Sequence, residues 1–307
     1  MTSTSVDPGG SAVRFVIQAA IWGSRFTLIS VAVRAVSPSL VVLSRLALAA
    51  TVLLALAGWR HAALVRGRSL WLHTAVAAAL GNVVPYVFLT YGERTTAAGT
   101  AGVLIGATPL LTLALGVVAV RDTPPSVHTF VGFGTAFAGL VLVIGPHGGG
   151  WAPSPGMLLC LGAAVSYAAG YVYVRRFLTR PGTSALGAAA SQLVAALALQ
   201  AILTPVLGWH IGVVHPDAAM ALVLLGLLGT GYATVLYFRL IADLGAARAA
   251  AVDYLVPVFA VLFGVLVSGE HLGASVIAGA VLILSGMAIG EGRVSFRRFA
   301  GGRCVDL

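Results

Sequence analysis

The chain contains no lysine and few charged residues of any kind. Only 9% of its 307 residues are charged, whereas 59% are hydrophobic and the mean hydropathy is +1.00. Globular domains carry about 25% charged residues. This scarcity of charge excludes an ordinary soluble domain and indicates a membrane protein.

The absence of lysine also bears on nucleotide binding. The glycine-rich stretch GLLGTG at residues 226–231 has the composition of a phosphate-binding loop, but such a loop needs a following lysine to contact the phosphates. All 18 basic residues are arginine. We therefore expect no nucleotide site of this type and no transport driven directly by ATP.

Cysteine is scarce, and arrangements typical of an enzyme are missing. Cys160 and Cys304 lie in an apolar segment and in the carboxy-terminal tail, and imply no disulfide framework. Among the seven histidines, only His210 and His215 cluster with an acid, Asp217, and their spacing matches no zinc motif. We predict that the protein is not an enzyme and has no metal site and no cofactor.

Two other classes of protein stay open. One is a membrane-embedded hydrolase, although Ser44, Ser166 and Ser191 have no histidine and carboxylate on matching helical faces. The other is a non-transporting membrane scaffold protein. Flux of a labelled solute in proteoliposomes would distinguish a transporter from both.

Apolar runs of about 20 residues, the length that crosses a bilayer as a helix, follow one another along the chain. Helices are expected because a lipid-exposed backbone must satisfy its own hydrogen bonds. The first ten residues lack the basic start of a signal peptide, so we expect the first span to be retained. We predict an all-α integral membrane protein with ten transmembrane helices, at residues 15–33, 39–58, 70–90, 95–119, 126–145, 155–174, 185–207, 217–238, 246–268 and 272–290.

The arginines predict the orientation of these spans. With the amino terminus inside, fourteen arginines fall in cytoplasmic segments and two, Arg34 and Arg94, fall outside. We therefore predict a multi-pass protein of the plasma membrane with both termini in the cytoplasm. The net charge of +9 is spread over short loops and the tail, which favours anionic lipid headgroups over nucleic acid as its partner.

A pattern in the first half returns 148 residues later. Pro109 matches Pro257, and Asp122 matches Glu270. The joint PHGGGWAPSP, residues 146–155, has the prolines and glycines of a turn. We predict two five-helix repeats, at residues 1–150 and 151–307. Because five is odd, the repeats enter the membrane from opposite sides, a pattern typical of secondary transporters that bind solute between the halves.

The sequence from Leu236 to Ile289 resembles the carboxy-terminal half of an EamA-type transporter of the drug/metabolite transporter superfamily. The shared features are LGAARA at 244–249, the helix centred on Pro257, the Gly269–Glu270 turn and the Gly279–Gly286 helix.

The first half carries a weaker copy, with WGSRF at 22–26 and Arg45–Leu46. It departs at Arg121–Asp122, where the family more often has Gly-Glu. The resemblance implies a ten-helix bundle that moves small organic solutes, often outward, such as amino acids. It also implies that spans one, three, four, six, eight and nine surround a cavity, while spans five and ten pack at the periphery.

Three prolines lie near the middle of the membrane, within the third, fourth and ninth predicted spans. Pro85, Pro109 and Pro257 each lack an amide hydrogen and crowd the carbonyl four residues back. A freed carbonyl in lipid must be satisfied by neighbours or by a wet cavity. We interpret the prolines as hinges near a binding site, with simple packing kinks as the alternative.

Glycine has a plainer role. The chain has 38 glycines, and the Gly102–Gly106 and Gly286–Gly290 spacings are typical of helices that approach closely in a membrane. We predict that these glycines serve packing.

Polar residues inside spans are costly and are usually functional. Arg25 and Arg45 are expected in the external half of the bilayer. There they would anchor the structure, with Glu93 or Glu270 as partners, or contact an anionic group of the solute; we assign Arg45 a structural role. The residues singled out inside the predicted spans are Arg25, Arg45, Asn82, Gln192 and Asp253.

A polar and aromatic wall is predicted for the solute site. Asn82 and Tyr86 share one face of the third span. Aromatic rings in deeper positions offer apolar area with a polar handle, although interface belts are the rival explanation. The predicted solute-binding residues are Trp22, Asn82, Tyr86, Tyr167, Tyr171, Tyr232 and Asp253.

Asp253 is an acid that we expect well inside the ninth span, about 10 Å from its cytoplasmic end at 1.5 Å per residue. Burial disfavours the charged form of a carboxyl, and we expect Arg25 and Arg45 at another depth. Asp253 is therefore predicted to exchange a proton for solute, to attract a cationic group of the solute, or to serve the structure.

The matched acids Asp122 and Glu270 precede spans five and ten. There a carboxylate complements the amino-terminal helix dipole and caps free amides. We predict that both residues are structural caps of those two spans.

These observations predict a secondary transporter that exports small organic metabolites by alternating access. Either facilitated diffusion or exchange for protons would set the direction of solute transport. The expected partners are a small solute, protons in the second case, and the lipid bilayer. We expect a monomer or a weak homodimer.

Overall fold

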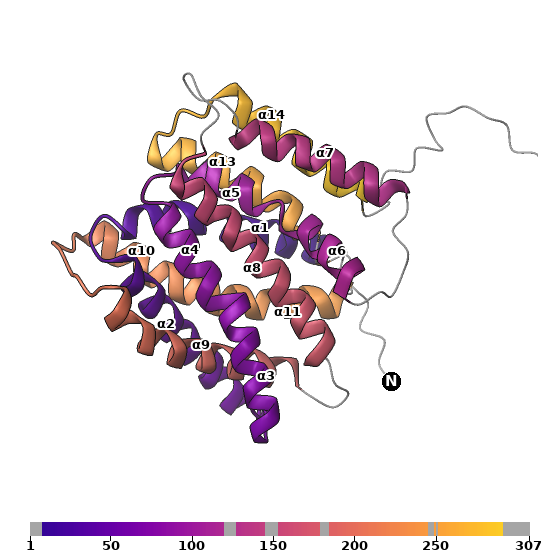
Figure 1. The fold of residues 1–307 in the computed structure, drawn as a ribbon. Coiled ribbons are helices and arrows are strands. Elements are labelled where there is room, and N and C mark those ends of the chain that lie inside the picture. Colours follow the sequence, from indigo (N-terminus) through magenta and orange to yellow (C-terminus); the bar gives the residue numbers. More distant parts are fainter. Residues whose placement is uncertain are drawn as a thin grey trace, which may run out of the picture.

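The computed structural model describes residues 8–119, 127–144, 153–178, 184–244, 249 and 251–290. Within these residues every regular element is a helix, and the β interactions amount to one isolated bridge between Val36 and Ile211. The predicted all-α class is therefore confirmed for the described part of the chain. Figure 1 shows the helices packed as one bundle.

Within the described residues, the helices of each half group into five rods. In the first half these are α1 (Pro8–Ala32), α2 (Pro38–Trp59), α3–η1–α4 (Arg68–Ala78, Ala79–Val83 and Val84–Gly92), α5–α6 (Ala98–Ile105 and Thr108–Ala119) and α7 (Val127–Ile144). In the second half they are α8 (Pro155–Phe177), α9 (Ala185–Leu207), α10–η2–α11 (Pro216–Gly226, Leu227–Tyr232 and Ala233–Leu244), α13 (Val252–Ser268) and α14 (Ala274–Gly290).

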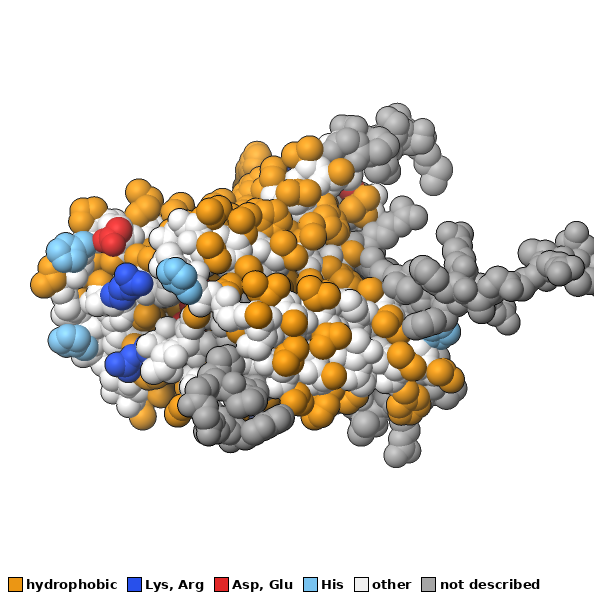
Figure 2. Space-filling view, turned by 90° about the horizontal axis from the view of Figure 1, so that it is seen from above, with side chains coloured by type: hydrophobic (Ala, Val, Ile, Leu, Met, Phe, Trp, Pro, Cys, Tyr) orange, Lys and Arg blue, Asp and Glu red, His pale blue; other side chains and the backbone are white. Residues whose placement is uncertain are grey.

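The outer surface of the bundle is apolar. Side chains such as Ile202, Val206 and Leu266 are 72%, 82% and 70% exposed, which a soluble monomer would not tolerate over so large an area. Figure 2 shows hydrophobic side chains over the middle of one face, with most of the visible charged and histidine side chains at one end.

Seven helical segments of the described chain are long and apolar enough to cross a membrane. Three shorter apolar helices, Val127–Val143, Val252–Ser268 and Ala274–Gly290, occupy the remaining predicted spans.

The two halves pack as symmetric partners. Helix α1 of the first half packs on α13, and the equivalent helix α8 of the second half packs on α5 and α6. Likewise α2 packs on α9, and α7 on α14. The third and eighth rods each contain a π-helical segment, and η1 and η2 start at Ala79 and Leu227, which are equivalent at the 148-residue offset. The repeat in the sequence is thus also a repeat in the structure.

Glycines bring several of these helix pairs close together. A Cβ added at Gly139 of α7 would lie 2.7 Å from the carbonyl oxygen of Gly279 in α14, and Gly132 contacts the backbone of Gly286 in the same way. In α5, a Cβ on Gly102 would collide with that of Ala260 in α13. The predicted packing role of Gly102 and Gly286 is confirmed. Figure 1 shows α7 and α14 together at one edge of the bundle, as the resemblance implies.

Two predicted spans differ from the structure. The fourth is not continuous, because α5 ends at Ile105 and α6 begins at Thr108, with Pro109 in its first turn. The ninth begins at Val252, so Asp253 lies in the first turn of α13 and not about 10 Å inside a helix. Asp122 and residues 146–152 of the predicted joint lie outside the described residues.

Candidate functional site

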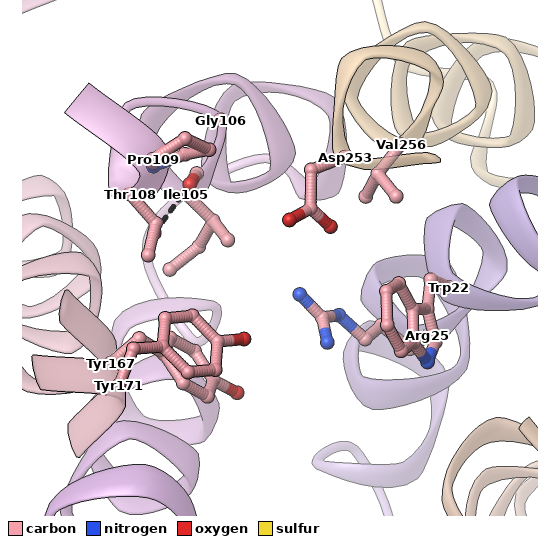
Figure 3. Close-up of a pocket in the computed structure, with 10 residues that line it drawn as sticks. All are labelled: Trp22, Arg25, Ile105, Gly106, Thr108, Pro109, Tyr167, Tyr171, Asp253 and Val256. Carbon is pink, nitrogen blue, oxygen red and sulfur yellow. Dashed lines mark hydrogen bonds between the residues drawn. The ribbon is translucent and has the colours of Figure 1, made fainter. Parts of the chain in front are cut away.

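A pocket lies between the two repeats, at the break between α5 and α6 (Figure 3). It holds about 440 Å³ of empty space, its open mouth included. Two pairs of equivalent helices line it, α1 with α8 and α5–α6 with α13. Its lining residues are Trp22, Arg25, Ile105, Gly106, Thr108, Pro109, Tyr167, Tyr171, Asp253 and Val256.

Opposite charges face each other across this central pocket. The guanidinium group of Arg25 in α1 points toward the carboxylate of Asp253 in α13 (Figure 3). The expectation that these two side chains lie at different depths is therefore wrong. The structure differs from the expected span in that α13 begins only at Val252, so Asp253 lies in its first turn.

Aromatic side chains form the opposite wall. The rings of Tyr167 and Tyr171 in α8 stack with centroids 6.4 Å apart, and both hydroxyls point into the pocket (Figure 3). The Tyr167 hydroxyl is buried and has no hydrogen-bond partner among the described residues. On the other side of the pocket Trp22 lies beside Arg25 (Figure 3), and its ring packs on Tyr237 at 5.0 Å between centroids. A buried hydroxyl without a partner is costly unless a ligand or water satisfies it.

The break beside the pocket follows from Pro109. Proline has no amide hydrogen, so the carbonyl of Ile105 loses its helical donor. The hydroxyl of Thr108 donates to that carbonyl at 2.6 Å. The side chain of Thr108 thus satisfies the group that we expected a cavity to satisfy, and sequence reasoning missed this residue.

Asn82 and Tyr86 lie beside the pocket and do not line it. Asn82 accepts a hydrogen bond from Gln192 Nε2 at 2.8 Å and donates to the Tyr86 hydroxyl at 3.4 Å. The Tyr86 ring lies against Tyr167, with centroids 6.3 Å apart, and under the guanidinium of Arg45 at 3.8 Å. Tyr86 therefore packs against the pocket residue Tyr167 without lining the pocket itself.

Other predicted site residues lie further away. Tyr232 is in η2, is 47% exposed and is not among the residues that line the pocket. Pro85 follows η1 in the first turn of α4, and Pro257 packs on Gly106 at the edge of the pocket. Their role as hinges stays a prediction.

Arg45 and Glu270 do not pair as the sequence suggested. Arg45 is 2% exposed, and its Nε donates to Thr230 Oγ1 of η2 at 2.7 Å. Glu270 accepts hydrogen bonds from the amides of Ala98 at 2.7 Å and Gly99 at 2.9 Å. Glu270 therefore caps α5, not the tenth span that follows it. The capping role was predicted, but the helix it caps belongs to the other repeat.

Sequence reasoning also missed the burial of Glu93, which follows α4. Its side chain is 5% exposed, and neither carboxylate oxygen has a hydrogen-bond partner among the described residues. Its position in a short loop gave no signal of burial. The described residues contain no group of three or more side chains suited to a metal ion.

A multi-pass helical bundle built from two repeats around a central pocket has the architecture of a membrane transporter. The model of the EamA-like transporter family matches residues 11–145 and again residues 154–289. The chain therefore belongs to the EamA-like transporter family.

A solved crystal structure has the same fold, with a TM-score of 0.65 at 22% sequence identity. The match covers 95% of this chain and 99% of that one. A search of curated proteins finds no match to the chain.

Proposed function

We propose that the protein is a secondary transporter that carries small organic amines, such as amino acids and related compounds, out of the cell in exchange for protons. It acts in the plasma membrane with both termini in the cytoplasm. The central pocket binds the solute, and the two repeats open it to one side of the membrane at a time.

The observation that carries this proposal is that Arg25 and Asp253 face each other in an aromatic pocket between the repeats. The Asp253 carboxylate attracts an ammonium group, and the Arg25 guanidinium attracts a carboxylate. Rings such as Trp22 and Tyr171 accept alkyl or aromatic groups and favour a nearby cation. The unpartnered hydroxyl of Tyr167 offers a further hydrogen bond.

Among the three roles considered for Asp253, contact with the amine is the one that this pocket favours. A structural role alone would not require a position facing the pocket space. The role of proton carrier makes a different prediction in the experiment below.

The test is exchange of labelled amino acids in proteoliposomes that contain the purified protein. Unlabelled solutes with a free amine should compete, while their N-acetylated counterparts should compete roughly ten- to hundredfold more weakly, because they lack the ammonium charge. Asp253→Asn should weaken exchange by a similar factor. Asp217→Asn is the matched control, because Asp217 is exposed in the first turn of α10.

Absence of exchange for every amine in the panel would overturn the proposed function. If Asp253→Asn retained full exchange but lost accumulation driven by a proton gradient, Asp253 would be a proton carrier and not a solute contact.

A further inference from the structure

Glu93 is a buried carboxyl that the solute pocket does not use. It is the first residue of the loop at 93–97, at the end of the bundle that also holds the loops at 33–37 and 269–273. The arginine count predicts that this end is external. An opening there, with about 900 Å³ of empty space including open solvent, reaches Glu93 between Arg34, Arg94 and Glu270. The opening thus ends at Glu93, whose two carboxylate oxygens are themselves buried beneath it.

Two of the charges around Glu93 are held by other groups. Glu270 is held by two amides of α5, and Arg45 is held by Thr230 and the Tyr86 ring. Arg25 is the neighbouring charge that acts most strongly on Glu93. The titratable or charged groups that face Glu93 from neighbouring elements are Arg25 of α1, Arg45 of α2, Cys160 and Tyr167 of α8, and Glu270 after α13.

Burial raises the pKa of Glu93 well above its ordinary value, and Glu270 raises it further, while Arg25 and Arg45 lower it. Burial is the largest of these effects. The lack of a hydrogen-bond donor among the described residues agrees with this direction, because no hydrogen bond from those residues stabilises the charged form.

Arg25 connects Glu93 to the solute pocket. Its guanidinium faces Asp253 in the pocket, and its charge acts on Glu93 on the external side. One arginine is thus shared between two carboxylates.

We propose that Glu93 is the proton-binding site of the transporter, and that it controls solute binding through Arg25. A proton from water at the external end adds to a carboxylate oxygen of Glu93, and Arg25 then pairs with Asp253 and displaces the amine. Loss of the same proton returns Arg25 to Glu93 and leaves Asp253 to the ammonium group of the solute. Proton and amine therefore exclude each other, which is the linkage that exchange requires. This inference rests on the proposed function.

The first test is amine binding to the purified protein as a function of pH. In the wild type, affinity should fall by about tenfold for each pH unit below the pKa of Glu93, as expected for competition with one proton. Glu93→Gln imitates the protonated state and should bind weakly with no such dependence, whereas Glu93→Asp should keep a pH dependence. A wild-type pH profile that persists unchanged in Glu93→Gln overturns the proposal.

The second test needs no solute. A carboxyl whose pKa is raised by burial contributes stability that is present at low pH and is lost as the pH rises through the folded-state pKa. The melting temperature of the wild type should therefore fall over that range, and Glu93→Gln should flatten the curve. Asp217→Asn should not change its slope. If the melting temperature of Glu93→Gln depends on pH as steeply as that of the wild type, Glu93 does not titrate over this range and the proposal is overturned.

The two proposals fail in different ways. If no amine is bound or exchanged but the melting curve flattens in Glu93→Gln, the proposed solute class is wrong and Glu93 still titrates. If amines are exchanged with the same pH dependence in both proteins, the proposed function stands and the role of Glu93 is wrong.

Discussion

Arg45 in α2 donates from Nε to the hydroxyl of Thr230 in η2 at 2.7 Å, which ties the first repeat to the second inside the bundle. The equivalent tie runs from Gln192 in α9 to Asn82 in η1 at 2.8 Å. Asn82 and Thr230 are 148 residues apart, the spacing of the repeat. Each half therefore uses a polar side chain of its second helix to hold the π-helical segment of the other half.

The first prediction concerns the hydrogen bond from Arg45 to Thr230. Arg45→Met keeps much of the length of the side chain but removes its hydrogen bond to Thr230 and its charge over the Tyr86 ring. We expect a loss of about 1.5–3 kcal/mol in stability, the usual range for a hydrogen bond to a charged group. Thermal melting in detergent measures this loss. Arg34→Met, at an exposed loop position, is the control and should melt like the wild type.

The second prediction concerns the cap of α5. Glu270→Ala removes the acceptor of the Ala98 and Gly99 amides and should lower stability by roughly 0.5–2 kcal/mol. Glu270→Gln keeps one acceptor oxygen and should lose less. Neither change should alter which solutes compete in exchange. A Glu270→Ala protein with full thermal stability and altered solute selectivity would contradict the capping role.

The third prediction concerns the contact between α5 and α13. Gly102→Ala places a methyl group against Ala260 and should cost about 1–3 kcal/mol, because the helices must separate. Gly116→Ala is the matched control in the same rod, because an added Cβ there meets nothing within 4 Å. The control should be neutral or gain up to about 1 kcal/mol from helix propensity. Equal melting of the two variants would show that the close approach is not required.

The fourth prediction concerns orientation. In a chain with Cys160 and Cys304 replaced by serine, Val213→Cys should react with a membrane-impermeant thiol reagent in intact cells, because Val213 is 76% exposed in a predicted external loop. His61→Cys, at an exposed position in the opposite loop, should react only after permeabilisation. The reverse pattern would invert the topology.

Much of the architecture could be predicted from the sequence. Apolar runs of about 20 residues predict the helices, because local composition decides whether a segment can cross the bilayer as a helix. The return of Pro109 as Pro257 predicts the repeat, and the distribution of arginines predicts the orientation. The glycine spacing at Gly102 predicted a close helix contact, which the structure places against Ala260. The aromatic residues Tyr167 and Tyr171, four apart on one helix, were likewise identified from spacing alone.

The sequence by itself determined the helical class, the repeat and the family. Tertiary structure alone decided that Arg25 and Asp253 face one pocket, that Glu270 caps α5 and not the helix that follows it, and that Glu93 is buried. The physical reason is distance along the chain. Glu270 and Ala98 are 172 residues apart, and only the packing of helices from opposite repeats brings the carboxylate of Glu270 to the backbone amides of another helix.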